Sequence, residues 1–287
     1  MDGFQLCGNR LLHVSWTGLS AEVHSWAPMV NFWLTLPLPG LLASLVLFFC
    51  VTGGILVWLS FGPMTGAAVQ RLKGVVPPVM GAIAVILAIL IGFLASDIWE
   101  RERGAAAAVR AEANQLVALD RLAATFGLPR DSLDAAIRTY AATVVQKEWP
   151  SMEREQASPD AENALDQLFK AVDALDLNTA NRGDLDRLMT STALEVRTAR
   201  NTRLSLAQNH SDDAKWLSVL ALAVMAQVSV AMVHLERPRP QIAALAVLTI
   251  SIIIVTGTLA AHELPFSAPL PISPAPLAHV LALVPAG

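Results

Sequence analysis

Three arginines recur at intervals of three residues in the second half of the chain: Arg197, Arg200 and Arg203. This spacing keeps their side chains near one face of a helix, with a drift of about 60° per step. A positive stripe at the mouth of a membrane pathway would attract anions and raise their local concentration. These arginines are therefore candidate anion-attracting residues. Two alternatives remain open: a face that contacts only water, and ion pairs with acids such as Glu112 and Asp120.

The remaining polar residues show no spacing typical of catalysis or metal binding. The six histidines form no HxxxH or HExxH pair, and the two cysteines, Cys7 and Cys50, form neither a disulfide framework nor a metal motif. No glycine-rich phosphate loop and no nucleophile-elbow motif occurs. We therefore expect no catalytic residue, no metal ligand, no cofactor and no enzymatic activity.

A second unusual cluster consists of Glu148, Trp149 and Pro150, followed by Met152. Such a cluster could serve as an interface or as a platform for a ligand. A tryptophan beside a proline at a helix end also packs commonly into a core, and we favour that interpretation.

The composition indicates an apolar frame around a polar insert. The chain is 54% hydrophobic and only 15% charged, whereas soluble domains carry about a quarter charged residues. Between Asp97 and Lys215 there are 20 acidic and 15 basic residues, and the rest of the chain holds 4 acidic and 5 basic ones. An acidic insert excludes nucleic acid as the expected partner, because phosphate binding needs a basic face.

Four apolar stretches are long enough to cross a lipid bilayer, which requires about 20 residues. They are residues 38–60, 76–99, 216–235 and 241–261. The sequence therefore predicts an all-α integral membrane protein with four spans, whose helical extramembrane domain lies between spans two and three.

The stretch from Pro77 to Thr125 predicts one long helix, because nothing breaks it where an apolar run gives way to charges at Asp97. Its first half would lie in lipid and its second half in water. Copies of this helix around an axis would form a hydrophobic constriction that gates by dewetting. The candidate pore-lining residues are Ile83, Ile86, Leu90 and Phe93; packing within one chain is the alternative.

The polar insert is also predicted to be helical, without strands. A helix begins near Asp131, capped by Asp131 or Ser132, and bends or ends at residues 147–150. Another begins after Ser158 with proline in its first turn. A last one runs from about Asp184 into span three.

These elements divide the chain into five parts. The predicted parts are an N-terminal extension (1–37), spans one and two (38–99), the helical domain (100–213), spans three and four (214–262) and a proline-rich C-terminal tail (263–287). Within that tail, Ser273 and Pro274 would begin a short final helix.

The order and spacing of several of these residues resemble the bacterial bestrophin-like domain family, once a domain of unknown function, over roughly residues 38–281. The residues that carry the resemblance are Trp99, Glu100, Glu112, Arg121, Tyr140, Glu148, Trp149, Pro150, Pro265 and Phe266.

The family name implies similarity to bestrophins, which are pentameric anion channels with four spans per subunit and a large cytosolic helical region. The resemblance thus implies a homo-oligomer in a bacterial inner membrane that conducts an anion, with span two lining the pore. The calcium-binding acidic cluster of bestrophins has no counterpart here, so calcium gating is not implied. The alternative function is a membrane-anchored sensor or scaffold whose helical domain binds a protein or small ligand.

The orientation in the membrane stays open from the sequence. Four spans place both termini on the same side as the helical domain. The short connections carry Arg71, Lys73, Arg237 and Arg239, and the positive-inside rule would make those connections cytoplasmic. The resemblance places the helical domain in the cytoplasm instead.

Overall fold

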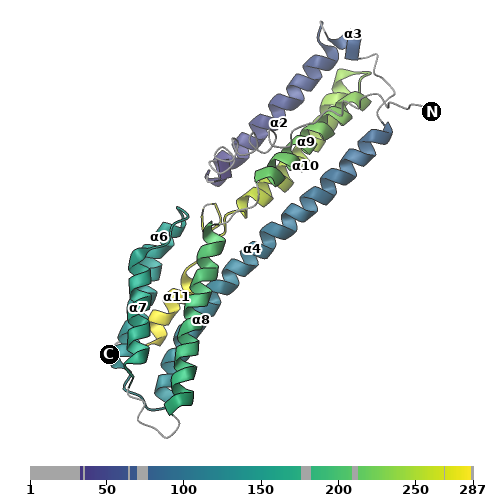
Figure 1. Cartoon of the computed structure of the whole chain (residues 1–287). Coiled ribbons are helices and arrows are strands. Elements are labelled where there is room, and N and C mark those ends of the chain that lie inside the picture. Colours follow the sequence, from purple (N-terminus) through teal and green to yellow (C-terminus); the bar gives the residue numbers. More distant parts are fainter. Residues whose placement is uncertain are drawn as a thin grey trace, which may run out of the picture.

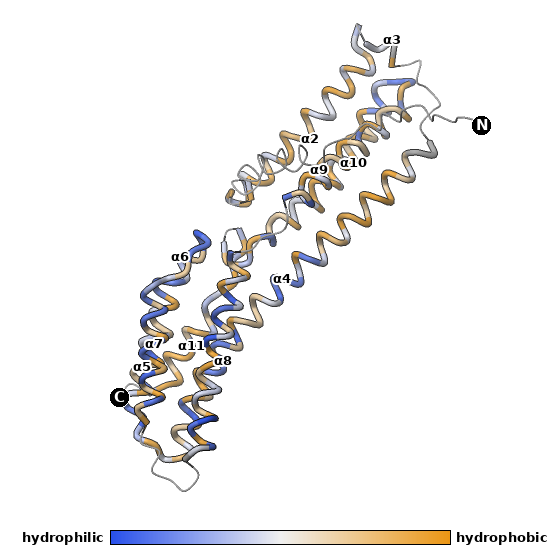
Figure 2. Tube along the Cα trace, viewed as in Figure 1, coloured by the Kyte–Doolittle hydropathy of each residue, from blue (hydrophilic) through white to orange (hydrophobic). Residues whose placement is uncertain are grey.

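The computed structural model describes residues 33–34, 36–63, 65–69, 77–175, 182–208, 213–267 and 269–285. All regular structure in these ranges is helical, as the sequence predicted. The molecule is elongated, with apolar helices at one end and an amphipathic helical domain at the other (Figures 1 and 2). The predicted N-terminal extension falls almost wholly outside the described residues.

The membrane end contains α2 (Leu38–Phe61), α9 (Asp213–Val233), α10 (Pro238–Ala261) and the first half of α4 (Pro77–Thr125). A one-turn helix, α3 (Gly66–Val69), follows α2. Four helices within the described residues are long and apolar enough to cross a membrane, as the sequence predicted. Helices α2 and α10 agree with spans one and four within three residues, α9 begins three residues before and ends two residues before the predicted span three, and α4 continues past the predicted end of span two. Figure 2 shows that these helices are predominantly hydrophobic along their length, and many of their large apolar side chains are exposed.

The four-span group is held together partly by a buried polar side chain. Gln227 of α9 is fully buried. Its amide nitrogen donates to the Phe49 carbonyl at 3.2 Å and to Thr249 Oγ1 at 2.8 Å, and its oxygen accepts from Thr52 Oγ1 at 2.7 Å. One residue thus joins α9 to α2 and α10, as polar side chains do between membrane helices.

Helix α4 connects the two ends of the molecule as a single rod of 49 residues. Prolines occupy its first two positions, where no intrahelical amide bond is lost. Gly104 does not break it and faces Leu206 of α8 (Arg182–Gln208). It ends at Thr125; Gly127 then adopts a φ of 66°, which suits glycine, and Leu128 N donates back to the Ala123 carbonyl at 2.9 Å. The predicted continuous helix is confirmed.

The helical domain packs α5 (Asp131–Thr143), α7 (Pro159–Asp173) and α8 against the second half of α4. Between α5 and α7 lie a π-helical turn, η2 (Val144–Glu148), and a short helix, α6 (Trp149–Met152). The core contains buried side chains from every one of these elements, among them Leu116, Leu133, Val144, Met152, Leu165 and Met189.

The segment after α10 belongs physically to the helical domain. The predicted final helix is present as α11 (Ala275–Leu283), and Ala275 N donates to Ser273 Oγ at 3.2 Å. Phe266, Leu277 and Val280 are buried in the same core as α4, α5 and α8. The proline-rich tail is therefore a structural part of that domain.

Several local predictions were wrong or incomplete. The predicted cap at Asp131 or Ser132 was wrong, because Arg130 occupies the N-cap position of α5. The predicted start of α7 was correct, with Ser158 at the N-cap position and Pro159 in the first turn, although Ser158 forms no side-chain capping bond. Near the predicted bend or end at residues 147–150, the α-helix that begins at Asp131 changes at Val144 into the π-helical turn η2 and then ends with α6 at Met152. The predicted continuity of α8 into span three rests on residues 209–212, which lie outside the described residues.

Candidate functional site

Among the residues that the structure describes, one face of the membrane segment of α4 is not covered by another helix. Leu87, Leu94 and Ile98 point inward and are buried against α9 and the other spans. The opposite face is outward and apolar; its large members are Val85, Ile86, Ile89 and Phe93, each more than half exposed. We call these four residues the outward face of α4.

The structure separates the four candidate pore-lining residues into two pairs. Phe93, 70% exposed, and Ile86, 53% exposed, lie one heptad apart on the outward face. Ile83 and Leu90 are partly buried against the core of the spans. A residue that packs on neighbouring spans contributes less to an external surface, so Ile86 and Phe93 are the stronger candidates.

The same face of α4 changes from apolar to polar where the helix leaves the spans. Ser96, Glu100 and Arg103 follow Phe93 at intervals of three or four residues, and all three are exposed. Helical periodicity places them on one stripe with Ile86 and Phe93. The rod therefore presents an apolar band and then a hydrophilic one along a single side.

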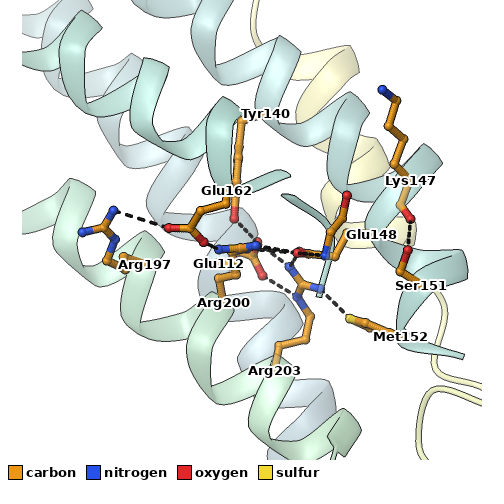
Figure 3. A network of polar contacts seen from close by, with 11 residues as sticks. Glu112, Tyr140, Lys147, Glu148, Ser151, Met152, Glu162, Arg197, Arg200 and Arg203 are labelled. Carbon is orange, nitrogen blue, oxygen red and sulfur yellow. Dashed lines mark hydrogen bonds and ion pairs between the residues drawn. The ribbon is translucent and has the colours of Figure 1, made fainter. Parts of the chain in front are cut away.

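In the helical domain, a closed ion-pair network joins α4, α5, η2, α7 and α8 (Figure 3). Arg203 of α8 donates to both carboxylate oxygens of Glu112 on α4, at 2.7 and 3.0 Å, and to Glu148 Oε2 at 2.7 Å. Tyr140 donates its hydroxyl to Glu112 Oε1 at 2.6 Å. The Arg203 guanidinium also lies over the Trp149 ring, 5.6 Å from its centroid.

Arg200 completes the network one turn earlier on α8. It donates to Glu148 Oε1 at 2.6 Å and pairs with Glu162 of α7 at the rim. Arg197, which is half exposed, bonds Asp166 at 3.1 Å. Arg197 thus lies near the surface, whereas Arg200 and Arg203 are buried.

The electrostatics of this network favour charged arginines and carboxylates. Burial alone would raise the pKa of Glu148, but the hydrogen bond from Arg200 and the charge of Arg203 outweigh it and lower that pKa. Burial disfavours the charged form of Arg203, yet the adjacent Glu112 carboxylate raises the pKa of Arg203 above its ordinary value. Burial, and then the negative charge of Glu112, raise the pKa of Tyr140 well above its ordinary value.

Two of the candidate anion-attracting residues thus have their charges neutralised inside the domain. Arg200 and Arg203 are buried, and two carboxylates, Glu112 and Glu148, balance them. The alternative of pairing with Glu112 is confirmed for Arg203; Asp120 pairs instead with Arg130. A sequence signal did exist, because Arg200 and Arg203 continue the buried positions of α8 at Met189 and Val196.

The structure brings together five of the ten residues that carry the family resemblance. Glu112, Tyr140 and Glu148 belong to the network. Trp149 packs edge-on against Phe266, with ring centroids 5.6 Å apart, which favours packing over a ligand platform. The others lie elsewhere: Trp99, Glu100 and Arg121 are exposed along α4, Pro150 is in the first turn of α6, and the Pro265 carbonyl accepts from Ile272 N.

Sequence reasoning missed a second set of ion pairs, at the junction between the spans and the helical domain. Arg101 of α4 bonds Glu263 at 2.6 Å, and Trp216 of α9 donates to the same carboxylate at 3.2 Å. Lys215 bonds Asp97 at 2.7 Å. The spacing in sequence is too long for any local pattern to show these pairs.

Across the ranges that the structure describes, no group of three or more metal-ligating side chains is found. The site consists of the outward face of α4, the network that holds α4 to α8 and the junction between them. Together these features define a four-span helical membrane protein with a helical domain built on the extension of its second span.

Comparison with known proteins places this architecture in a family. The bestrophin-like domain matches residues 47–277, so the chain belongs to the bestrophin-like family. A crystal structure of a bacterial bestrophin homologue from Klebsiella pneumoniae shares the fold with a TM-score of 0.63 at 14% identity, covering 84% of this chain and 96% of that one.

A second crystal structure, described only as a membrane protein, has a TM-score of 0.65 at 12% identity and covers 85% of this chain and 97% of that one. A point mutant of the Klebsiella pneumoniae homologue gives 0.63 at 13% identity, covering 85% of this chain and 98% of that one. No curated protein matches the sequence.

Proposed function

We propose that the chain forms a homo-oligomeric anion channel in the bacterial inner membrane, with the outward face of α4 lining the pore. The observation that carries the proposal is the exposure of Phe93 and Ile86 on a helix that continues into water. Membership of the bestrophin-like family supports the anion as the conducted species. The helical domain lies in the cytoplasm in this proposal.

The choice of α4 over the other spans rests on its course through the molecule. Helices α2 and α10 also carry exposed apolar residues, such as Phe48 and Val247, but both end where the spans end. Within the described residues, α4 is the span that continues unbroken from its outward face into a polar stripe through Ser96 and Glu100. A pore lined by α4 would lead directly into an aqueous vestibule lined by the polar stripe of the same helix.

The apolar band on α4 would act as the constriction. A ring of phenylalanine and isoleucine side chains is dry when narrow and wets when it widens, which is the physical basis of hydrophobic gating. Leu87 and Leu94 hold the opposite face of α4 against the other spans. The position of α4 against these spans would therefore set the width of the constriction.

Reconstitution tests the proposal. The full chain in liposomes is expected to release chloride faster than protein-free liposomes, and electron microscopy of the purified protein is expected to show a ring with α4 innermost. Chloride release equal to that of empty liposomes, or a monomer by native mass spectrometry, would exclude the channel. A monomer with a stable partner lost on deletion of the helical domain would favour the sensor or scaffold.

Orientation has its own test. A cysteine at the exposed Ser132, in a chain with Cys7 and Cys50 replaced by serine, should resist a membrane-impermeant maleimide in intact cells and react after lysis. Labelling in intact cells would place the helical domain outside, as the charges of the connections predict.

A further inference from the structure

A hollow of about 160 Å³ lies between the second half of α4 and the C-terminal helix α11. Two helical faces line it. From α4 come Arg110, Ala113, Asn114 and Val117, and from α11 come Pro276, His279, Val280 and Leu283. Both sets follow intervals of three and four, so each helix turns one continuous face to the hollow.

Three polar side chains at this hollow have no protein partner. Within the described residues, the side chains of Arg110, Asn114 and His279 form no ion pair and no hydrogen bond. All three side chains are exposed. The buried arginines of the helical domain, Arg200 and Arg203, bind carboxylates instead. The three groups therefore offer unused donors at one place.

The charge of the hollow is positive. No acidic residue lines it, and α11 contains no Asp or Glu at all. A guanidinium presents a planar fork of donors that matches two oxygens of an oxyanion. The Asn114 amide adds two donors, and the His279 imidazole has at least one N–H in either protonation state.

We propose that this hollow is a binding site for a small tetrahedral oxyanion, phosphate or sulfate, held by Arg110, Asn114 and His279. The volume suits an ion of a few heavy atoms and excludes a nucleotide. The other lining residues are apolar and supply no competing acceptor side chain. The inference stands without ion conduction, because neither the ligand nor the site belongs to the spans.

A free ion fits the position better than a lipid headgroup does. Trp99, at the end of the span, precedes Arg110 by 11 residues, which is about 16 Å along a helix. Figure 1 shows α11 within the helical domain, away from the apolar helices.

A bound anion would connect α4 to α11, and α5 already holds α11 on another side. Arg138 of α5 donates to the carbonyls of Leu281 and Val284 at the end of α11, at 2.5 and 2.8 Å. An anion on the α4 side would fix α11 from its second face. A ligand that binds only the docked helix stabilises docking by mass action, so phosphate should slow hydrogen exchange in residues 275–283.

The test uses the full-length protein in detergent, titrated with inorganic phosphate by calorimetry in a chloride buffer. Wild type should bind one phosphate per chain, and Arg110→Ala should weaken binding at least about tenfold because the charged fork is lost. Arg110→Lys should bind between the two, and His279→Ala should bind more weakly than wild type. Arg121→Ala, on the same helix with an exposed arginine outside the hollow, is the matched control and should bind as wild type does.

Three outcomes would overturn the proposal: no saturable binding to wild type, equal binding by wild type and Arg110→Ala, or equal losses in Arg110→Ala and Arg121→Ala. Exchange in 275–283 gives a second readout, which phosphate should slow in wild type and leave unchanged in Arg110→Ala. Repeating the titration in nanodiscs with and without phosphatidic acid distinguishes a site for free phosphate from a site for a lipid headgroup. Phosphate affinity should be the same in both, and competition by the lipid would assign the site to a headgroup.

Discussion

Arg203 and Glu112 form a bidentate ion pair, with Nε to Oε2 at 2.7 Å and Nη2 to Oε1 at 3.0 Å, although 91 positions separate them in the chain. Both side chains are fully buried. The pair fixes α8 to α4, the helix that continues into the second span. Removing one partner would leave an uncompensated charge in the core, which costs far more than an exposed pair contributes.

Arg203→Met should therefore destabilise the helical domain by about 3–5 kcal/mol in the free energy of unfolding, followed by circular dichroism in urea. The double variant Glu112→Met with Arg203→Met should recover part of this loss, because neither charge is then left alone. Arg187→Ala, which removes an exposed arginine, is the control and should change stability by less than about 0.5 kcal/mol. A single variant as stable as wild type would contradict the role of the network.

Asp134 of α5 gives a prediction about pH. Burial, and then the negative charge of Asp120, raise the pKa of Asp134 despite the nearby Arg130. A raised folded-state pKa means that the stabilising contribution of the protonated group is fully present below the unfolded-state pKa. It is lost as the pH rises through the folded-state pKa.

Asp134→Asn should accordingly raise the melting temperature at pH 7.5, and the difference from wild type should shrink as the pH falls toward about 4. The exposed neighbour Asp131 offers a control in Asp131→Asn, for which we expect no such pH-dependent gain. An equal effect of Asp134→Asn at both pH values would show that its charge is not responsible.

Arg138 is expected to anchor α11. Arg138→Ala removes two hydrogen bonds to the carbonyls of Leu281 and Val284, worth about 1.5–3 kcal/mol each when the donor is charged. Hydrogen exchange in residues 275–283 should become faster. Exchange in α7, which Arg138 does not bind, should stay unchanged and serves as the control. Unaltered protection of α11 would mean that its apolar contacts suffice.

Gln227→Leu tests the polar contact among the spans. The change removes hydrogen bonds to three positions on α2 and α10, and such contacts contribute about 0.6–2 kcal/mol in membranes. The melting temperature in detergent should fall. Ser251→Ala, which removes only a hydrogen bond within α10, should leave the melting temperature unchanged. Equal melting temperatures of the two variants would show that the Gln227 hydrogen bonds do not stabilise the packing of the spans.

The sequence predicted those parts of the structure that depend on local patterns. The course of α4 followed from the absence of any breaker between Pro78 and Gly127, and the spans followed from uncharged length. The final helix followed from Ser273 and Pro274. The family resemblance rested on residues that the fold then gathered, because Glu112, Tyr140 and Glu148 are required together by one buried network.

Long-range pairing could not be predicted in the same way. The sequence does not show which carboxylate reaches Arg200, because Glu148 and Glu162 approach it from a π-helical turn and a separate helix. The cap predicted at Asp131 or Ser132 was wrong because Asp131 lies in the first turn of α5, and Arg130 occupies the position before it. The bonds from Arg138 to α11 depend on how the tail folds back over 140 residues, which no periodicity reveals.

The most direct test of the pore assignment is chemical block at Phe93. Phe93→Cys, in a chain with Cys7 and Cys50 replaced by serine, would place a thiol on the outward face of α4. A water-soluble methanethiosulfonate should then abolish most of the chloride flux of reconstituted protein, and Phe48→Cys, exposed on α2, should be unaffected. Full flux of the modified Phe93→Cys protein, with labelling verified by mass, would contradict a pore lined by α4.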